Sequence, residues 1–337
     1  MILKNEAYAR AGLLGNPSDM YGGKVISFVI KNFAARVRLW ESQSLTFRLH
    51  PQHDRTEFAD LQDLVSAVRS HGYYGMQRLL LATCRRFADF CQEREIKLPK
   101  ANFTLEYESD IPRQSGLGGS SAIIIAALRA LLKFYRVPAK ALTDNELADL
   151  ALSVEMQELG ITAGLQDRVV QVYGGLTYMD FSKQPALHER LDSRLLPRFG
   201  LAYLADEQFG TRESGQVHNQ VRFRWERGDP EVKKTMRALA RLAAAGLEAL
   251  KQKDTLALGR LMNRNFDLRR ALFGDKVIGR HSIRLIELAR ACGFPAKLPG
   301  SGGAALVLLN HTNPQAEQAL AKAYAAEGYH YTTIHAV

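Results

Sequence analysis

The sequence predicts an α+β protein of two lobes. Strands rich in β-branched and aromatic residues are mixed with helices without strict alternation, which is typical of this class. From about residue 213 onward the composition turns to long helices rich in Ala, Leu and Arg. A chain of 337 residues that is 46% hydrophobic is long enough to bury two cores. We therefore expect an N-terminal lobe over 1–182, of mixed strands and helices, and a C-terminal α+β lobe over 183–337.

The N-terminal elements follow from local composition. Residues 7–15 and 24–50 are rich in β-branched and aromatic residues broken by Asn and Ser, so a succession of strands is expected there. Apolar residues recur at helical spacing over 73–95 and predict a long helix. The remaining elements expected are a strand over 102–109, a helix over 122–134, a helix over 143–159 opened by a capping box at Thr143 and Glu146, a shorter helix over 163–175 and a strand over 176–181.

The C-terminal elements begin with a strand over 199–206. Long segments rich in Ala, Leu and Arg then favour helices, because these residues have high helix propensity. The chain closes with the segment "PAKLPGSGGAALVLLN", in which a glycine loop precedes an apolar strand, and with a last strand, "YHYTTIHA". The helices expected are 213–227, 231–252, 254–272, 281–292 and 313–327.

The net charge of +10 indicates an anionic partner. Lys and Arg are interleaved with Glu and Asp, and there is no arginine-rich tail or zinc-finger spacing, so small anionic ligands fit better than nucleic acid or a membrane surface. The N-terminal stretch "MILKNEAYAR" lacks the apolar run of a signal peptide, which favours a soluble, cytoplasmic protein. Three cysteines without a Cys-x-x-Cys pair argue against a disulfide framework and a structural zinc site.

The segment "IPRQSGLGGSSAIII", over 111–125, has the character of a phosphate-binding loop. Its glycines let the backbone approach a ligand closely, while Ser120 and Ser121 present hydroxyls and amides at the N-terminus of a helix, which attracts phosphate. The alternative is a plain turn with a good N-cap. The loop is not a Walker loop, because the chain contains no Gly-x-x-x-x-Gly-Lys-Ser/Thr.

Acidic residues at suitable positions complete the requirements of phosphoryl transfer. The reaction needs a phosphate cradle, a magnesium ion and a group that orients or deprotonates the attacking hydroxyl. Glu155 and the Ser120 hydroxyl are candidate Mg²⁺ ligands, and Asp167, next to Arg168, is a candidate base. The alternatives are that Glu155 is a solvated helix-face carboxylate and that Asp167 only favours a helix N-terminus.

Three motifs in order resemble those of the GHMP kinase family. They are "ARAGLLGNPSDMYGG", "PRQSGLGGSSA" and "KLPGSGGAALVL", which together span the chain. The resemblance implies the two-lobed fold of that family with the active site between the lobes, ATP as phosphoryl donor and Mg²⁺ as cofactor. Further strings, including "AGLQDRVVQVYGGL" and "NFDLRRALFGD", are similar to plant-type glucuronokinases and imply D-glucuronate as the acceptor.

The resemblance also implies roles for single residues. Ser120, with Ser121 as a possible substitute, and Glu155 match the family's metal ligands, and Asp167 matches its catalytic aspartate. Arg10 stands where mevalonate kinase has a lysine. Arginine keeps the positive charge but not the readily shifted pKa of lysine, so it cannot easily act as a base, and that role is expected of Asp167. The residues expected to bind the nucleotide are Pro112, Gly116, Leu117, Gly118, Gly119, Ser120 and Ser121.

Asn16 is the most informative departure from the family pattern. Galactokinase has a Glu-x-x-Asp motif whose acids hold sugar hydroxyls, and the residues here are Asn16 and Asp19. A glutamate beside a uronate carboxylate would place two negative charges together, whereas an asparagine amide donates a hydrogen bond to it. A structural role for Asn16 in a turn with Pro17 is an almost equal interpretation.

A carboxylate substrate is also expected to meet a cation, preferably an arginine. The sequence does not choose among Arg113, Arg168 and Arg212, which stand next to the motifs. Thr211 is a further candidate contact, and the last glycine loop is expected to pack against the first; its residues are Gly300, Ser301, Gly302 and Gly303. The alternatives to a uronate kinase are a GHMP kinase for a heptose, arabinose, fucose or galactose, a non-catalytic sensor of sugar and nucleotide, and a nucleic-acid binder.

Overall fold

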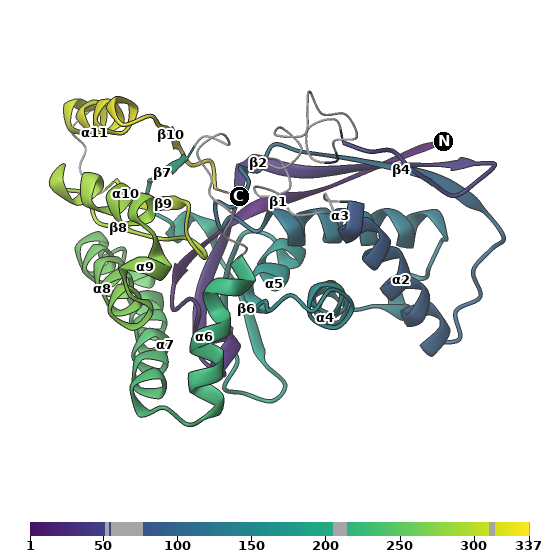
Figure 1. Ribbon diagram of the computed structural model, residues 1–337, viewed down its shortest axis with the longest axis horizontal. Helices are drawn as coiled ribbons and strands as arrows, with labels where there is room; N and C mark the ends of the chain where they lie inside the picture. The colour runs from purple at the N-terminus through teal and green to yellow at the C-terminus, as the bar shows by residue number, and fades with distance from the viewer. Residues whose placement is uncertain (51–53, 55–76, 205–213, 310–313, 337) are drawn as a thin grey trace, which may run out of the picture. The chain divides into compact units, whose positions relative to one another are not determined.

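The computed structural model describes residues 1–50, 54, 77–204, 214–309 and 314–336, with side chains described from residue 220 onward in the helix that begins at Ser214 (Figure 1). Its contacts cluster into two compact units that the chain enters more than once. Unit 1 comprises Met1–Ala9, Phe33–Ile111 and Gly119–Val172, and unit 2 comprises Arg10–Asn32, Pro112–Gly118 and Tyr173–Val337. Each unit is made of several separate stretches of the chain, whereas the lobes expected from the sequence are two continuous stretches divided at residue 182. The two divisions therefore cannot be compared directly, and the boundary at residue 182 stays a prediction.

The sheet of unit 1 is built around the second half of a long strand. Strand β2 (Lys24–Ser42) pairs antiparallel with β4 (Asn102–Ser109), from Ala35 opposite Ser109 to Ser42 opposite Asn102. The short β3 (Thr46–Phe47) pairs parallel with β4. The segment 24–50 is therefore one 19-residue strand followed by a short one, where the sequence suggested a succession of strands.

The helices of unit 1 lie on one side of its strands (Figure 1). The most buried is α3, whose apolar face extends almost around the helix because Ile, Ala and Leu fill it. Thr143 and Glu146 form the expected capping box at the start of α4. The helices are α2 (Gln77–Glu93), α3 (Gly119–Phe134), α4 (Asp144–Ser153), a π-helical turn η3 (Val154–Glu158) and α5 (Gln166–Tyr173), with a short 3-10 turn at Ala139–Ala141.

Unit 2 holds two sets of paired strands. The first half of β2 pairs antiparallel with β5 (Leu176–Asp180), which pairs with β6 (Leu187–Leu191). Sequence reasoning missed β6 because three polar residues in a row form its centre and no apolar alternation marks it. The other set is an antiparallel sheet in the order β10-β7-β9-β8. Its strands are β7 (Phe199–Leu204), β8 (Ala296–Lys297), β9 (Ala304–Leu308) and β10 (Tyr329–Thr333).

Helices cover this second sheet and form one apolar core with it. The core gathers Met236, Phe266, Leu285 and Tyr324 from four of these helices. The helices are α6 (Ser214–Glu226), α7 (Pro230–Lys251), α8 (Thr255–Phe273), α9 (Asp275–Ile278), α10 (Arg280–Ala291) and α11 (Pro314–Ala326), with 3-10 turns at Ser18–Tyr21 and Ser193–Leu195. Strand β1 (Ile2–Leu14) belongs to both units by sequence.

The α+β class predicted from the sequence is confirmed, and the structure places a helix or strand in most of the expected positions. No helix in the described part of the chain has the length and apolar character needed to cross a bilayer. All three cysteines are free, which agrees with the absence of a disulfide framework.

Candidate active site

Two glycine loops of unit 2 are in direct backbone contact. Gly116 has a φ of +66°, and a Cβ atom added to it would lie 2.7 Å from the amide nitrogen of Ser301. Gly118 also has a left-handed φ, +75°. Only glycine combines such a φ with so close a neighbour. The packing expected between the loop before α3 and the loop Gly300–Gly303 is therefore present in the structure.

Arg10, in the second half of β1, is hydrogen-bonded to both of these glycine-rich segments. Its side chain is buried, and its Nη1 atom donates to the carbonyl oxygen of Gly116 at 2.5 Å and to that of Pro299 at 3.2 Å. Its backbone N–H donates to the carbonyl of Leu117 at 2.9 Å. A buried guanidinium held by backbone carbonyls of both loops fixes their spacing and places positive charge beside them.

The loop Gly15–Asp19 follows β1 and is held by hydrogen bonds to a residue of α8. Asn16 and Asp19 are both buried. Asn265 of α8 accepts a hydrogen bond from the backbone N–H of Gly15 at 2.8 Å and donates from Nδ2 to the carbonyl of Asn16 at 3.5 Å. Asn16 is thus held by tertiary contacts and not only by its position before Pro17.

Lys297 is a residue of this group that sequence reasoning missed. It lies on β8, three residues before the last glycine loop, and it is fully buried. Its Nζ atom donates to Asn16 Oδ1 at 2.8 Å, to Gly12 O at 2.7 Å and to Leu298 O at 2.7 Å. Burial, followed by the charges of Arg269 and Arg10, lowers the pKa of Lys297 well below its usual value. The only signal in the sequence was a lysine in an otherwise apolar strand and loop.

Arg269 is the second residue that sequence reasoning missed. It lies near the C-terminal end of α8, a helix rich in arginine, and its exposed fraction is 1%, whereas Arg260 and Arg264 of the same helix are exposed. Its Nη1 atom donates to the carbonyl of Gly300 at 2.8 Å. Arg10, Arg269 and Lys297 are thus three buried cations of unit 2.

A second group of predicted residues lies within unit 1. Ser120, in the first turn of α3, donates from Oγ to Glu155 Oε1 at 2.9 Å. Glu155 forms an ion pair with Arg168 of α5. The Nη1 atom of Arg168 also lies 3.6 Å from Asp167 Oδ2 and donates a hydrogen bond to Gly164 O at 2.8 Å. The structure therefore brings Ser120, Glu155, Asp167 and Arg168 together.

The π-helical turn explains why Glu155 is not a solvated carboxylate. Residues Val154–Glu158 widen the end of α4, and this wider turn places Glu155 on the buried side with an exposed fraction of 4%. π-helical turns often occur at functional sites because they redirect a side chain out of the regular helical register. The solvated-face interpretation of Glu155 is wrong for this reason.

The oxygens of Ser120 and Glu155 fit a magnesium ion. Both are hard ligands, and they lie within hydrogen-bonding distance of each other. No cluster of three or more His, Cys, Asp or Glu side chains suited to a metal occurs in the described ranges. Mg²⁺ usually takes one or two protein ligands and completes its shell with phosphate oxygens and water.

The remaining predicted residues are placed as follows. Ser121 is buried and Arg113 is half-buried. Thr211 and Arg212 lie outside the described residues. The last glycine loop borders a cavity of about 1020 Å³, whose lining includes Gln114 of the first loop together with Ser301, Gly302 and Gly303.

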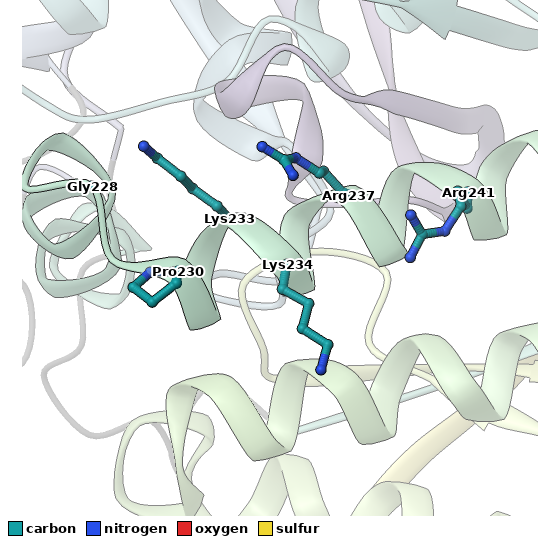
Figure 2. A pocket seen from close by; sticks show the side chains of 6 residues that line it. All are labelled: Gly228, Pro230, Lys233, Lys234, Arg237 and Arg241. Carbon is teal, nitrogen blue, oxygen red and sulfur yellow. The ribbon is translucent and has the colours of Figure 1, made fainter.

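A smaller cavity of about 280 Å³ lies along α7, away from these groups in the sequence (Figure 2). Four cations of one helix line it, and no carboxylate does. None of the four forms an ion pair within the part of the chain that the structure describes. The lining residues are Gly228, Pro230, Lys233, Lys234, Arg237 and Arg241.

Comparison with known proteins relates these features to one family. The family models "GHMP kinases N terminal domain" and "GHMP kinases C terminal" match residues 79–175 and 247–330. Glucuronokinase 1 of Arabidopsis thaliana is 45% identical over 90% of this chain and 84% of its own length, and Probable glucuronokinase 2 of the same plant is 46% identical over 91% and 84%. The structure of Lactococcus lactis galactokinase complexed with galactose shares the fold, with a TM-score of 0.75 at 15% identity, covering 100% of this chain and 94% of that one.

Proposed function

From the premise that the chain belongs to the GHMP kinase family, we propose that it is a sugar-acid kinase. It transfers the γ-phosphoryl group of ATP to the anomeric hydroxyl of D-glucuronate and yields glucuronic acid 1-phosphate and ADP. The observation that carries this proposal is the identity of 45% with Glucuronokinase 1 across 90% of the chain. Identity of that degree over 90% of the chain supports a shared substrate.

The phosphates of ATP bind at the loop Pro112–Ser121. Left-handed glycines let the backbone of this loop approach a ligand closely, and the N-terminus of α3, which begins at Gly119, carries a partial positive charge that attracts phosphate. Arg10, held by the carbonyls of Gly116 and Pro299, adds charge that stabilises the transferring phosphoryl group. Magnesium, held by Ser120 and Glu155, neutralises phosphate charge when it is bound.

Asp167 orients the acceptor hydroxyl and takes its proton. The hydroxyl oxygen forms a bond to the γ-phosphorus while the bond from that phosphorus to the bridging oxygen of ADP breaks. Arg168, 3.6 Å from Asp167 and paired with Glu155, positions both carboxylates. This arrangement supports an active kinase over a sensor, because a sensor needs no ordered base beside a metal ligand.

The sugar binds beside Asn16 and Asp19. Lys297 has only donors, so it fixes Oδ1 of Asn16 as the acceptor and leaves the amide Nδ2 as the donor. That nitrogen lies 3.4 Å from Pro299 O, at the edge of hydrogen-bonding distance, and remains a donor for an acidic substrate. Further contacts are proposed for Arg113, Arg168, Thr211, Arg212 and the loop residues Gly300, Ser301, Gly302 and Gly303.

A coupled assay of ADP release tests the proposal. Mg-ATP is supplied with D-glucuronate, D-galacturonate, D-glucose, D-galactose, L-arabinose, mevalonate and homoserine. Turnover on D-glucuronate in preference to the others supports the proposal, and Asp167→Ala is expected to lower kcat by about 100-fold to 10,000-fold. Preference for a neutral sugar contradicts the uronate assignment. The absence of turnover on every acceptor favours the sensor.

A further inference from the structure

Unit 2 buries more positive charge than its own carboxylates balance. Its buried cations in the described ranges are Arg10, Arg269 and Lys297, and its buried acids are Asp19 and Asp180. Asp180 is already paired with Lys24 at 3.1 Å. Burying a cation without a charged partner is costly, so a cation of that kind is typical of a site built for an anion.

Arg269 is the cation least satisfied by the protein. Its exposed fraction is 1%, and its Nε atom is buried without a hydrogen-bond partner. Nη1 donates to Gly300 O, and the guanidinium carbon lies 5.9 Å from the ring centroid of Phe273. No carboxylate in the described ranges lies within 4.0 Å of it. The Nε donor of this rigid, buried fork is therefore left without a hydrogen-bond partner in the protein.

The surroundings disfavour the charge of Arg269, and an anion would relieve that. Burial and then the charge of Arg10 lower the pKa of Arg269 to about 10, and Asp19 only partly opposes them. Lys297, the other fully buried cation, is satisfied by two backbone carbonyls and the amide oxygen of Asn16, so none of its partners is charged. The excess positive charge is thus centred on Arg269.

The position of Arg269 links it to the loop Gly15–Asp19, the sugar loop, where the sugar is proposed to bind. Asn265 lies one helical turn before it on the same face of α8, and Asn265 binds the backbone of Gly15 and Asn16. Asp19, at the end of that loop, is close enough to act electrostatically on Arg269. A planar guanidinium binds a carboxylate through two parallel hydrogen bonds, a geometry that a lysine cannot supply.

We propose that Arg269 is the residue that binds the carboxylate of the sugar acid and so sets the preference of this enzyme for an acidic over a neutral sugar. This inference rests on the proposed function and adds a residue to its substrate site. Arg269 selects the substrate and takes no part in the chemistry at the anomeric carbon. Among the arginines weighed from the sequence, Arg168 is already paired with Glu155, so the contact proposed for it is with another part of the sugar and not with the carboxylate.

The test compares Arg269→Gln and Arg269→Lys with the unmodified protein and with Arg237→Gln. Arg237 is an exposed arginine of the α7 cavity, so the control removes the same charge without touching a buried site (Figure 2). Binding of D-glucuronate, D-galacturonate, D-glucose and Mg-ATP is measured by calorimetric titration, and KM for each is measured by ADP release. Circular dichroism checks that each variant is folded.

We expect Arg269→Gln to weaken D-glucuronate binding by about 30-fold or more, because truncating one partner of a buried charge pair has effects of that size. The Lys variant keeps the charge without the fork, and we expect a loss of about tenfold. Mg-ATP and D-glucose binding are expected to stay unchanged, as is every property of Arg237→Gln. If the Gln variant does not fold, the Lys variant carries the test.

Unchanged D-glucuronate affinity in a folded Arg269 variant overturns the inference while the proposed function stands. Weakened Mg-ATP binding with intact D-glucuronate binding also overturns it, because Arg269 would then serve the nucleotide. If the unmodified protein neither binds nor turns over D-glucuronate, the proposed function fails separately. In that case binding of D-galacturonate that depends on Arg269 still supports a carboxylate site, and a failure to bind any sugar acid overturns it.

Discussion

Replacing Gly116 with alanine tests whether the two glycine loops must touch. The added Cβ would lie 2.7 Å from Ser301 N and 3.0 Å from both Gly300 Cα and Gly302 O. All three are backbone atoms, so no flexible side-chain end can move aside. Gly174 is a matched control in the same unit, since its φ of +76° is also left-handed and nothing lies within 4 Å of its Cβ position.

The two variants separate the free-energy cost of a left-handed backbone conformation from the cost of the close contact between the loops. A left-handed alanine costs about 1–2 kcal/mol, offset by about 0.4–1 kcal/mol because alanine also restricts the unfolded chain. Gly174→Ala is therefore expected to lower the free energy of unfolding by about 1 kcal/mol. Gly116→Ala adds overpacking of about 1–3 kcal/mol and is expected to lose about 2–4 kcal/mol in total.

Urea unfolding of the two variants at one pH measures these values, and because both glycines belong to unit 2 the same transition reports them. ADP release provides a second measurement, in which KM for ATP rises in Gly116→Ala and stays unchanged in Gly174→Ala. Equal losses of stability in the two variants, with equal KM values, would refute the reasoning that loop contact requires glycine at position 116.

Three further predictions concern a cap, the sugar loop and a buried lysine. Thr143→Ala removes the capping box of α4 and is expected to cost about 1 kcal/mol, measured by urea unfolding; no loss would show that tertiary packing alone holds the helix. Asn16→Asp places a carboxylate beside the substrate and is expected to raise KM for D-glucuronate about tenfold or more while KM for ATP is unchanged; an unchanged KM would remove Asn16 from the sugar site. Because burial holds the pKa of Lys297 below 10.5, the unfolded chain binds more protons between the two pKa values, so stability should rise with pH in that window, by at most about 1.4 kcal/mol per pH unit. Lys297→Met should lack this rise. If the free energy of unfolding changed with pH in the same way in Lys297→Met and in the unmodified protein, the prediction would be contradicted.

Local sequence determined the secondary structure well where one element is strongly patterned. The capping box at Thr143 and Glu146 marked the start of α4 because both partners lie within one turn. The glycine loop before α3 was also visible, because closely spaced glycines and serines directly before an apolar run indicate a tight loop that leads into a buried helix. Strand β6 was missed, since a short strand at a sheet edge with three consecutive polar residues carries little local signal.

The candidate site was determined from sequence only where motifs carry it. Ser120, Glu155, Asp167 and Arg168 could be named from their spacing and from the family resemblance, and the structure brings all four together. The burial of Glu155 could not be anticipated, because a regular helix would have placed it differently from the π-helical turn.

Only the tertiary structure decided which cations are buried. Arg269 and Arg237 are both arginines of long, amphipathic helices, and no local pattern distinguishes them. Arg269 is buried because α8 packs under the loops that carry Gly15 and Gly300, whereas Arg237 lies on an exposed face of α7. Helical periodicity fixes which residues share a face, but only the fold determines what covers that face. The sequence by itself thus determined the family and its motifs, and the long-range contacts determined which of the cations are buried.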